Sequence, residues 1–177
     1  MTSDAQQRPR VLIAVASKHG ATRQIAEHIS ATLRQRAVEV TVEDADGADA
    51  LDVHDAVVIG SAVYAGHWLK EARRLAEQVA ALDRRPAVWL FSSGPIGDPP
   101  KPDEDPVDVT EISDMTGSRG HAVFAGKLDR STLGFGERAI TLALRAPEGD
   151  FRDWDAIAAW ADRIAEDLGA DLAARDG

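Results

Sequence analysis

Hydroxyl, basic and small side chains are grouped in one predicted turn, at Ser17, Lys18, His19, Gly20, Ala21 and Thr22. The turn lies between an apolar run at 11–16 and an amphipathic stretch that begins at Arg23, so it should join a strand to a helix. The first N–H groups of such a helix lack partners within it, and the helix dipole is positive at this end. With hydroxyl donors at Ser17 and Thr22 and close backbone approach at Gly20, we expect a phosphate group to bind here. The alternative is that Ser17 or Thr22 only caps the helix.

A second loop of mostly small residues carries the single tyrosine of the chain, and it consists of Ser61, Ala62, Val63, Tyr64, Ala65 and Gly66. The ring of Tyr64 is suited to stack on a flat heteroaromatic ligand. Gly66 would let a peptide group face that ligand without a side chain in the way. The alternative is that Tyr64 packs back on the helix that follows. We expect this inward packing for Trp68, which is in helical register with Ala72 and Leu75.

A third loop begins with Ser93, Gly94 and Gly97, and its backbone amides could bind the edge of the same ring. The alternative is an ordinary turn, because serine and glycine favour turns. The loop continues to residue 106 as a stiff, solvated segment rich in proline and acidic residues. At its end, Asp105 before Pro106 predicts the start of a short helix that closes near Gly117.

Other kinds of site do not fit the sequence. The first turn has one glycine where the dinucleotide-binding fingerprint needs three, and the stretch 120–127 lacks phosphate-loop spacing. The five histidines have no metal-ligand spacing, and no G-x-S-x-G nucleophile motif is present. The chain contains no cysteine, which excludes disulfides, thiolate catalysis and iron–sulfur sites held by cysteine.

The arrangement of apolar residues predicts an α/β fold. Continuous apolar runs at 11–16, 56–60 and 87–91 are typical of strands covered on both faces by helices. The alternating segment 38–42 predicts a strand at a sheet edge, and 121–125 predicts a fifth strand. With helical stretches between them, we expect a doubly wound five-stranded parallel sheet of order 2-1-3-4-5 with helices on both faces. The three loops then meet at the carboxyl ends of the strands, where such sheets bind ligands.

An extra segment at 127–150 interrupts this pattern between the fifth strand and the last helix, and it includes a helical stretch over 137–145. The last helix should begin at Asp150 or Asp153 and stop at Gly169. We expect a single domain over residues 10–170, with flexible ends at 1–9 and 171–177.

The formal net charge of −10 argues against binding of nucleic acid and favours a basic partner, if a protein partner docks. No apolar run is long enough to span a membrane, so we expect a cytoplasmic protein, at most peripheral to the membrane.

The loop of residues 17–22, the loop with Tyr64 and the five-strand pattern together resemble the flavodoxin superfamily. The resemblance implies FMN as cofactor, with its phosphate on the first loop and its isoalloxazine held by the second and third. Residues 124–129, with the sequence FAGKLD, and Asp153-Trp154 are similar to the flavodoxin-like, menaquinone-dependent protoporphyrinogen oxidase family. That family uses FMN to pass electrons from protoporphyrinogen IX to a quinone.

Three functions follow from the sequence and this resemblance. The first is an FMN-binding oxidoreductase acting on a porphyrinogen or a quinone. The second is a non-enzymatic electron carrier whose acidic surface docks basic redox proteins. The third is a scaffold that has lost its cofactor and serves as an interaction module.

Overall fold

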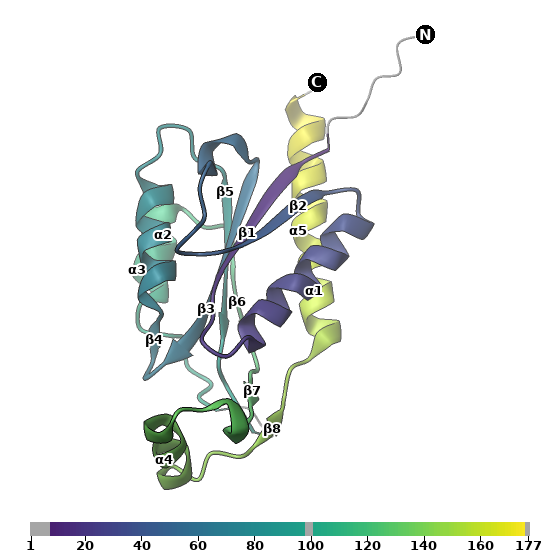
Figure 1. Ribbon diagram of the computed structural model, residues 1–177. Coiled ribbons are helices and arrows are strands. Elements are labelled where there is room, and N and C mark those ends of the chain that lie inside the picture. The colour runs from purple at the N-terminus through teal and green to yellow at the C-terminus, as the bar shows by residue number, and fades with distance from the viewer. Residues whose placement is uncertain (1–7, 98–100, 176–177) are drawn as a thin grey trace.

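The computed structural model describes residues 8–97 and 101–175 and has a central parallel sheet (Figure 1). The sheet order is β2-β1-β3-β5-β6, which is the predicted order for five strands. The strands are β1 (Arg10–Ala16), β2 (Glu39–Asp44), β3 (Ala56–Tyr64), β5 (Ala87–Ser93) and β6 (His121–Phe124). A short strand, β4 (His67–Trp68), also pairs antiparallel with the end of β3. The predicted edge position of the alternating strand is confirmed, because β2 pairs with β1 alone.

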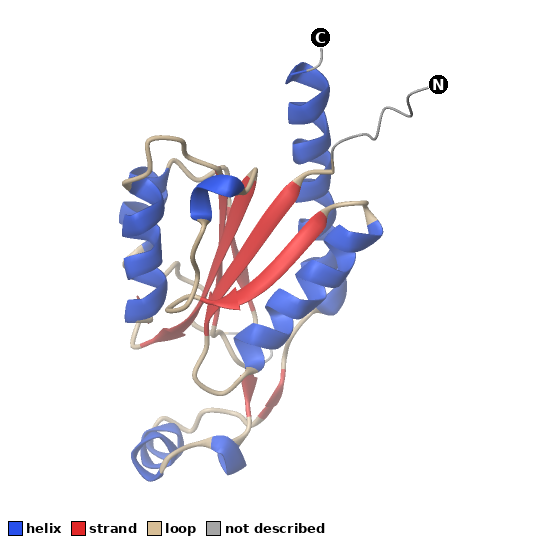
Figure 2. Ribbon diagram, turned by 45° about the horizontal axis from the view of Figure 1, so that its top comes forward, coloured by secondary structure: helices blue, strands red, loops and turns tan. Residues whose placement is uncertain are grey.

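Two layers of helices cover the sheet (Figure 2). Helices α1 (Ala21–Gln35) and α5 (Trp154–Arg175) lie on one face, and α2 (Lys70–Ala80) and α3 (Val109–Thr116) lie on the other. A 3₁₀ turn, η1 (Leu51–Val53), precedes β3. The apolar runs of the central strands are buried from both sides, as at Leu12 and Ile13 of β1, which point into opposite cores. This two-sided burial explains why these strands show no alternation in the sequence.

The extra segment forms a separate small unit below the carboxyl edge of the sheet (Figure 1). It consists of β7 (Lys127–Leu128), the 3₁₀ turn η2 (Arg130–Thr132), α4 (Phe135–Ala143) and β8 (Gly149–Asp150), with β7 and β8 paired antiparallel. No residue of α4 is buried. We call this unit, residues 127–150, the insert.

Two predicted helix ends were wrong. We expected α5 to stop at Gly169, but the helix continues through this residue to Arg175. Helix α3 begins at Val109 after Asp108, and not at Asp105. The Asp108 carboxylate does not cap its own helix, because it accepts hydrogen bonds from other parts of the chain. One of them comes from the backbone N–H of Trp68, at 2.9 Å. The start predicted at Asp153 is confirmed, since its carboxylate accepts a hydrogen bond from the backbone N–H of Ala156.

Parts of three expectations lie outside the described residues. These are most of the flexible N-terminus, the last two residues, and Asp98, Pro99 and Pro100 of the proline-rich loop. Within residues 8–97 and 101–175, none of the helices has the length and apolar character required to span a bilayer.

Candidate functional site

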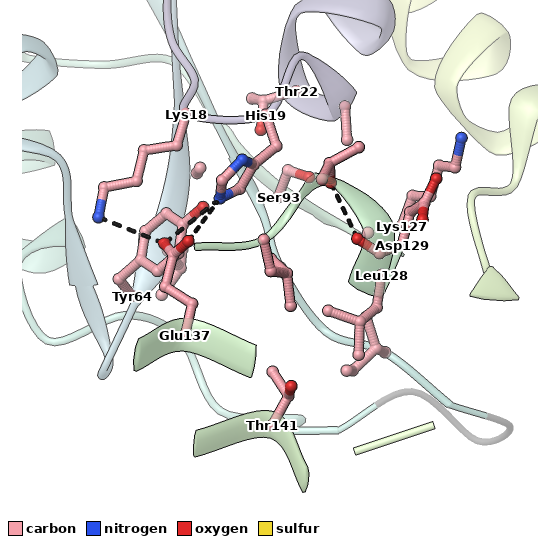
Figure 3. A pocket seen from close by; sticks show the side chains of 18 of the residues that line it. Lys18, His19, Thr22, Tyr64, Ser93, Lys127, Leu128, Asp129, Glu137 and Thr141 are labelled. Atoms are coloured by element: carbon pink, nitrogen blue, oxygen red, sulfur yellow. Dashed lines mark hydrogen bonds and ion pairs between the residues drawn. The ribbon is translucent and has the colours of Figure 1, made fainter. Parts of the chain in front are cut away.

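The three predicted loops meet at one cavity of about 510 Å³ at the carboxyl edge of the sheet (Figure 3). A volume of this size is typical of small-molecule sites. Eleven of the predicted residues line it: Ser17, Lys18, His19, Ala21, Thr22, Ala62, Val63, Tyr64, Ala65, Ser93 and Gly94. The switch point between β1 and β3 therefore carries the cavity, as expected for a sheet of this order.

The first loop presents the N-terminus of α1 to the cavity. Gly20 is the N-cap residue, with a φ of 83°, a left-handed conformation that suits glycine. No side chain caps the helix and its first turn contains no acidic residue, so its positive end is open to an anion. The Ser17 hydroxyl does not cap the helix; it accepts a hydrogen bond of 3.1 Å from the backbone N–H of Gly20 and so shapes the turn. These features fit a phosphate group.

The second loop is a hairpin between β3 and β4, with Tyr64 paired to His67. Its turn residues Ala65 and Gly66 have φ angles of 50° and 80°. The Tyr64 ring lies at the cavity and is 36 % exposed, so it does not pack into the core. The Lys18 ammonium is 4.5 Å from the centroid of this ring. Burial, and then the negative charge of Glu137, raises the pKa of the Tyr64 phenol, which therefore stays neutral well above pH 7.

Asp108, the residue that precedes α3, holds this hairpin in place. Asp108 accepts hydrogen bonds from the backbone N–H of Trp68 at 2.9 Å and from the His67 ring at 3.1 Å. Burial alone would raise the pKa of Asp108, but these hydrogen bonds outweigh it and lower the pKa, so the carboxylate stays charged. Trp68 itself is only 2 % exposed, which confirms its predicted inward orientation.

The third loop contributes Ser93, Gly94 and Ile96 to the cavity. Gly94 lies close to the second loop, because a Cβ atom placed on it would be 3.2 Å from the Cβ of Val63. This close approach brings the second and third loops together beside Tyr64.

Four predicted residues do not line the cavity: Gly20, Ser61, Gly66 and Gly97. Ser61 is fully buried, and its hydroxyl donates to the Ala62 carbonyl and accepts from the Leu69 N–H, so its polar atoms are used within the fold. Gly66 accepts a hydrogen bond from the backbone N–H of Val107 and borders a neighbouring cavity of about 360 Å³.

The other wall of the cavity was not predicted from the sequence. It is formed by the insert and by the residue that leads into it. Most of the additional lining residues belong to it: Gly126, Lys127, Leu128, Asp129, Thr132, Leu133, Glu137, Ile140, Thr141 and Leu144. The amphipathic pattern of 137–145 was visible in the sequence, but nothing in it indicated which surface the helix would face.

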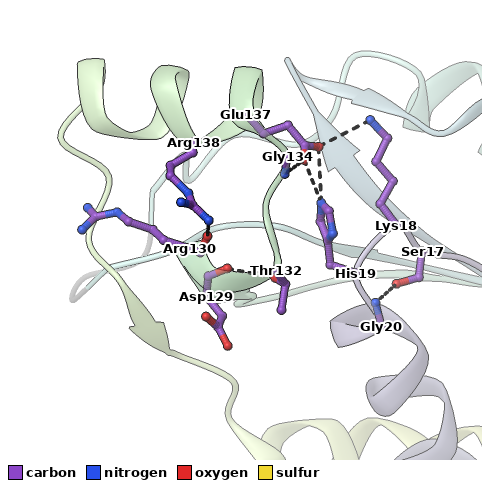
Figure 4. Close-up of polar contacts among 10 residues, drawn as sticks. All are labelled: Ser17, Lys18, His19, Gly20, Asp129, Arg130, Thr132, Gly134, Glu137 and Arg138. Carbon is purple, nitrogen blue, oxygen red and sulfur yellow. Dashed lines mark hydrogen bonds and ion pairs between the residues drawn. The ribbon is translucent and has the colours of Figure 1, made fainter.

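The insert is joined to the first loop by charge (Figures 3 and 4). A carboxylate oxygen of Glu137 is 3.2 Å from the Nε2 atom of His19, and the other is 3.7 Å from the Nζ atom of Lys18. Glu137 also accepts a hydrogen bond of 3.1 Å from the backbone N–H of Gly134. This hydrogen bond, together with the hydrogen bond and charge from His19 and the charge of Lys18, lowers the pKa of Glu137.

A parallel sheet with an open helix N-terminus and an aromatic loop at its switch point defines a doubly wound, nucleotide-binding α/β domain. The chain belongs to the flavodoxin domain family, which matches residues 12–155. The predicted flavodoxin-like fold and FMN as the cofactor are thereby confirmed.

Solved structures agree with this fold. A flavodoxin of Streptococcus pneumoniae is 19 % identical over 92 % of this chain and 99 % of its own, with a TM-score of 0.60. Rubredoxin oxygen:oxidoreductase of Desulfovibrio gigas is 16 % identical over 96 % of this chain and 39 % of its own, with a TM-score of 0.63. A flavodoxin variant of Fusobacterium nucleatum bound to flavin mononucleotide is 15 % identical over 66 % of this chain and 68 % of its own, with a TM-score of 0.50. No protein with a curated description matches the sequence significantly.

Proposed function

We propose that this protein is an FMN-dependent oxidoreductase that takes electrons from a porphyrinogen and passes them to a quinone. The observation that carries the proposal is the apolar wall that the insert adds beside the three loops, from Leu128, Leu133, Ile140 and Leu144. An electron carrier needs only an exposed ring edge, whereas an enzyme needs a surface against which an organic substrate can bind. The resemblance of residues 124–129 and of Asp153-Trp154 to the protoporphyrinogen oxidase family supports the same substrate.

The residues at the cavity divide into two groups by their chemistry. Ser17, Thr22 and the N–H groups at the start of α1 would hold the phosphate of FMN, because hydroxyl donors and the positive helix end favour an anion. Tyr64 and the backbone of Ser93 and Gly94 would orient the ring. Bound FMN supplies the redox chemistry. The chain itself would exclude water from one side of the ring through the apolar residues of the insert.

The first experiment is the visible absorption spectrum of the purified protein, followed by titration of the apoprotein with FMN. The proposal expects saturable binding that weakens in Thr22→Val and does not change in Thr110→Val, a matched change on the outer surface of α3. The holoprotein is then mixed anaerobically with protoporphyrinogen IX and a menaquinone analogue, and porphyrin fluorescence is followed. The absence of FMN binding would remove the proposal, and FMN binding without porphyrin formation would remove its substrate.

The net charge of −10 favours a second candidate, an electron carrier for basic redox proteins. Under this alternative, the holoprotein accepts electrons from a basic flavoprotein reductase at a rate that falls steeply with salt, and it does not oxidise the porphyrinogen. A chain that binds no flavin at all would instead match the third hypothesis, an interaction module.

A further inference from the structure

Glu137 lines the cavity beside the two basic side chains of the first loop, and Figure 4 shows its contacts with them. Its carboxylate contacts both basic side chains of the first loop, His19 at 3.2 Å and Lys18 at 3.7 Å. Its lowered pKa keeps it negatively charged at neutral pH. The same loop presents the open N-terminus of α1, where the proposed function places the dianionic phosphate of FMN.

A carboxylate and a phosphate at this end of the cavity compete for the same two basic side chains, Lys18 and His19, and repel each other. Glu137 can be displaced in this competition, because it is attached to a helix that little packing holds in place. No residue of α4 is buried, and Phe135, Leu142 and Leu144 are largely exposed. The ion pairs of Glu137 are therefore an important part of what fixes α4 against the first loop.

We propose that Glu137 is a specificity-determining residue of the flavin site, and this inference rests on the proposed function. Its carboxylate takes the place of the ligand phosphate on Lys18 and His19 and holds α4 over the cavity until a phosphorylated flavin displaces it. The wild-type protein therefore binds FMN less tightly than its phosphate-binding loop alone would allow. Riboflavin, which has no phosphate, does not compete with Glu137 for these two side chains.

The test compares Glu137→Gln with the wild type and with Glu148→Gln. Glu148 is a matched control, since it belongs to the insert but pairs with Arg130 and does not line the cavity. Each protein is titrated with FMN and, separately, with riboflavin, at low and at high salt. Loss of a like charge next to the phosphate should tighten FMN binding about five-fold in Glu137→Gln. Riboflavin binding should change less than about two-fold, and high salt should reduce the gain for FMN.

Two results would overturn the inference while leaving the proposed function intact. One is equal FMN affinity in the wild type and Glu137→Gln. The other is an equal change for FMN and riboflavin, which would mean that Glu137 only positions α4. Failure of all three proteins to bind FMN would remove the proposed function and this inference together.

Discussion

The indole N–H of Trp68 donates a hydrogen bond of 2.8 Å to the Oγ atom of Ser92, and this bond joins the second loop to the end of β5. The same Oγ atom is 2.7 Å from the Nε2 atom of His121 on the edge strand β6. The indole can only donate, so its bond leaves the hydrogen of the Ser92 hydroxyl available, and the Nε2 atom of His121 is the acceptor within reach of that hydrogen. With Nε2 as the acceptor, the neutral imidazole carries its hydrogen on Nδ1, which lies 3.7 Å from a carboxylate oxygen of Asp105.

Replacement of Ser92 by alanine should destabilise the protein, because it leaves the indole N–H buried without its partner. A buried donor without a partner costs about 1–3 kcal/mol. We expect the free energy of unfolding, measured by urea denaturation, to fall by that amount in Ser92→Ala. The control is Ser93→Ala, since Ser93 lines the cavity and does not join Trp68 to His121. Equal stability of the two variants would contradict this role for Ser92.

The stability of the protein should depend on pH through His121. Burial lowers the pKa of His121 from its ordinary value of 6.5. The negative charge of Asp105 acts to raise this pKa, but by less than burial lowers it. Below pH 6.5 the unfolded chain takes up a proton at this position more readily than the folded chain does. Stability from the neutral imidazole is thus present above pH 6.5 and is lost as the pH falls towards the lower pKa of the folded state.

The measurement is urea unfolding at several pH values between about 7.5 and 5. The wild type should lose stability over this range, and His121→Gln, which cannot be protonated, should lose less. Parallel profiles for the two proteins would show that the loss in this range comes from other groups.

Flavin binding should depend on the ring of Tyr64 and not on its hydroxyl group. The loss of a stacked aromatic pair costs about 0.5–1.5 kcal/mol, which corresponds to about a two- to ten-fold weaker affinity for FMN in Tyr64→Ala. Tyr64→Phe keeps the ring and should bind FMN within about two-fold of the wild type. Both values come from titration of the apoprotein followed by flavin fluorescence. A similar loss of affinity in the two variants would assign the effect to the hydroxyl group instead.

The sheet and the three loops could be predicted because their signals are local. The apolar runs of β1, β3 and β5 identify buried strands, and the polar turn after β1 identifies the helix N-terminus. Once the strand order is known, the carboxyl ends of these strands bring the loops together. The prediction of eleven lining residues followed from this topology.

The remaining features depend on tertiary contacts that leave no local signal. Asp105 before Pro106 has the sequence of a helix start, but the chain uses Asp108, whose carboxylate is held by Trp68 and His67. Helix α4 contacts the first loop through Glu137, whose partners His19 and Lys18 lie more than a hundred positions earlier in the chain. Gly169 did not stop α5, and the turns beyond it are held by ion pairs to distant parts of the chain, from Asp171 to Arg119 at 2.7 Å and from Arg175 to Asp55 at 3.3 Å.

Gly60 and Gly169 should respond in opposite ways to the same substitution. A Cβ atom at Gly60 would lie 2.1 Å from the Cζ atom of Phe91, its neighbour on β5, which packs against Phe124 and Trp160. The Phe91 ring cannot move away without disturbing this cluster, so Gly60→Ala should cost about 1–3 kcal/mol of unfolding free energy. Gly169→Ala meets no atom within 4 Å and should gain up to about 1 kcal/mol from helix propensity.

A double variant separates the clash at Gly60 from a general effect of alanine in the strand. Phe91→Leu alone should destabilise the protein, because it removes buried apolar volume. In the Gly60→Ala background, the smaller leucine also relieves the clash, so the two losses measured by urea denaturation should sum to more than the loss in the double variant. Strictly additive losses would mean that the strand accommodates the methyl group by a shift of its backbone, and that the Phe91 ring does not set the requirement for glycine at position 60.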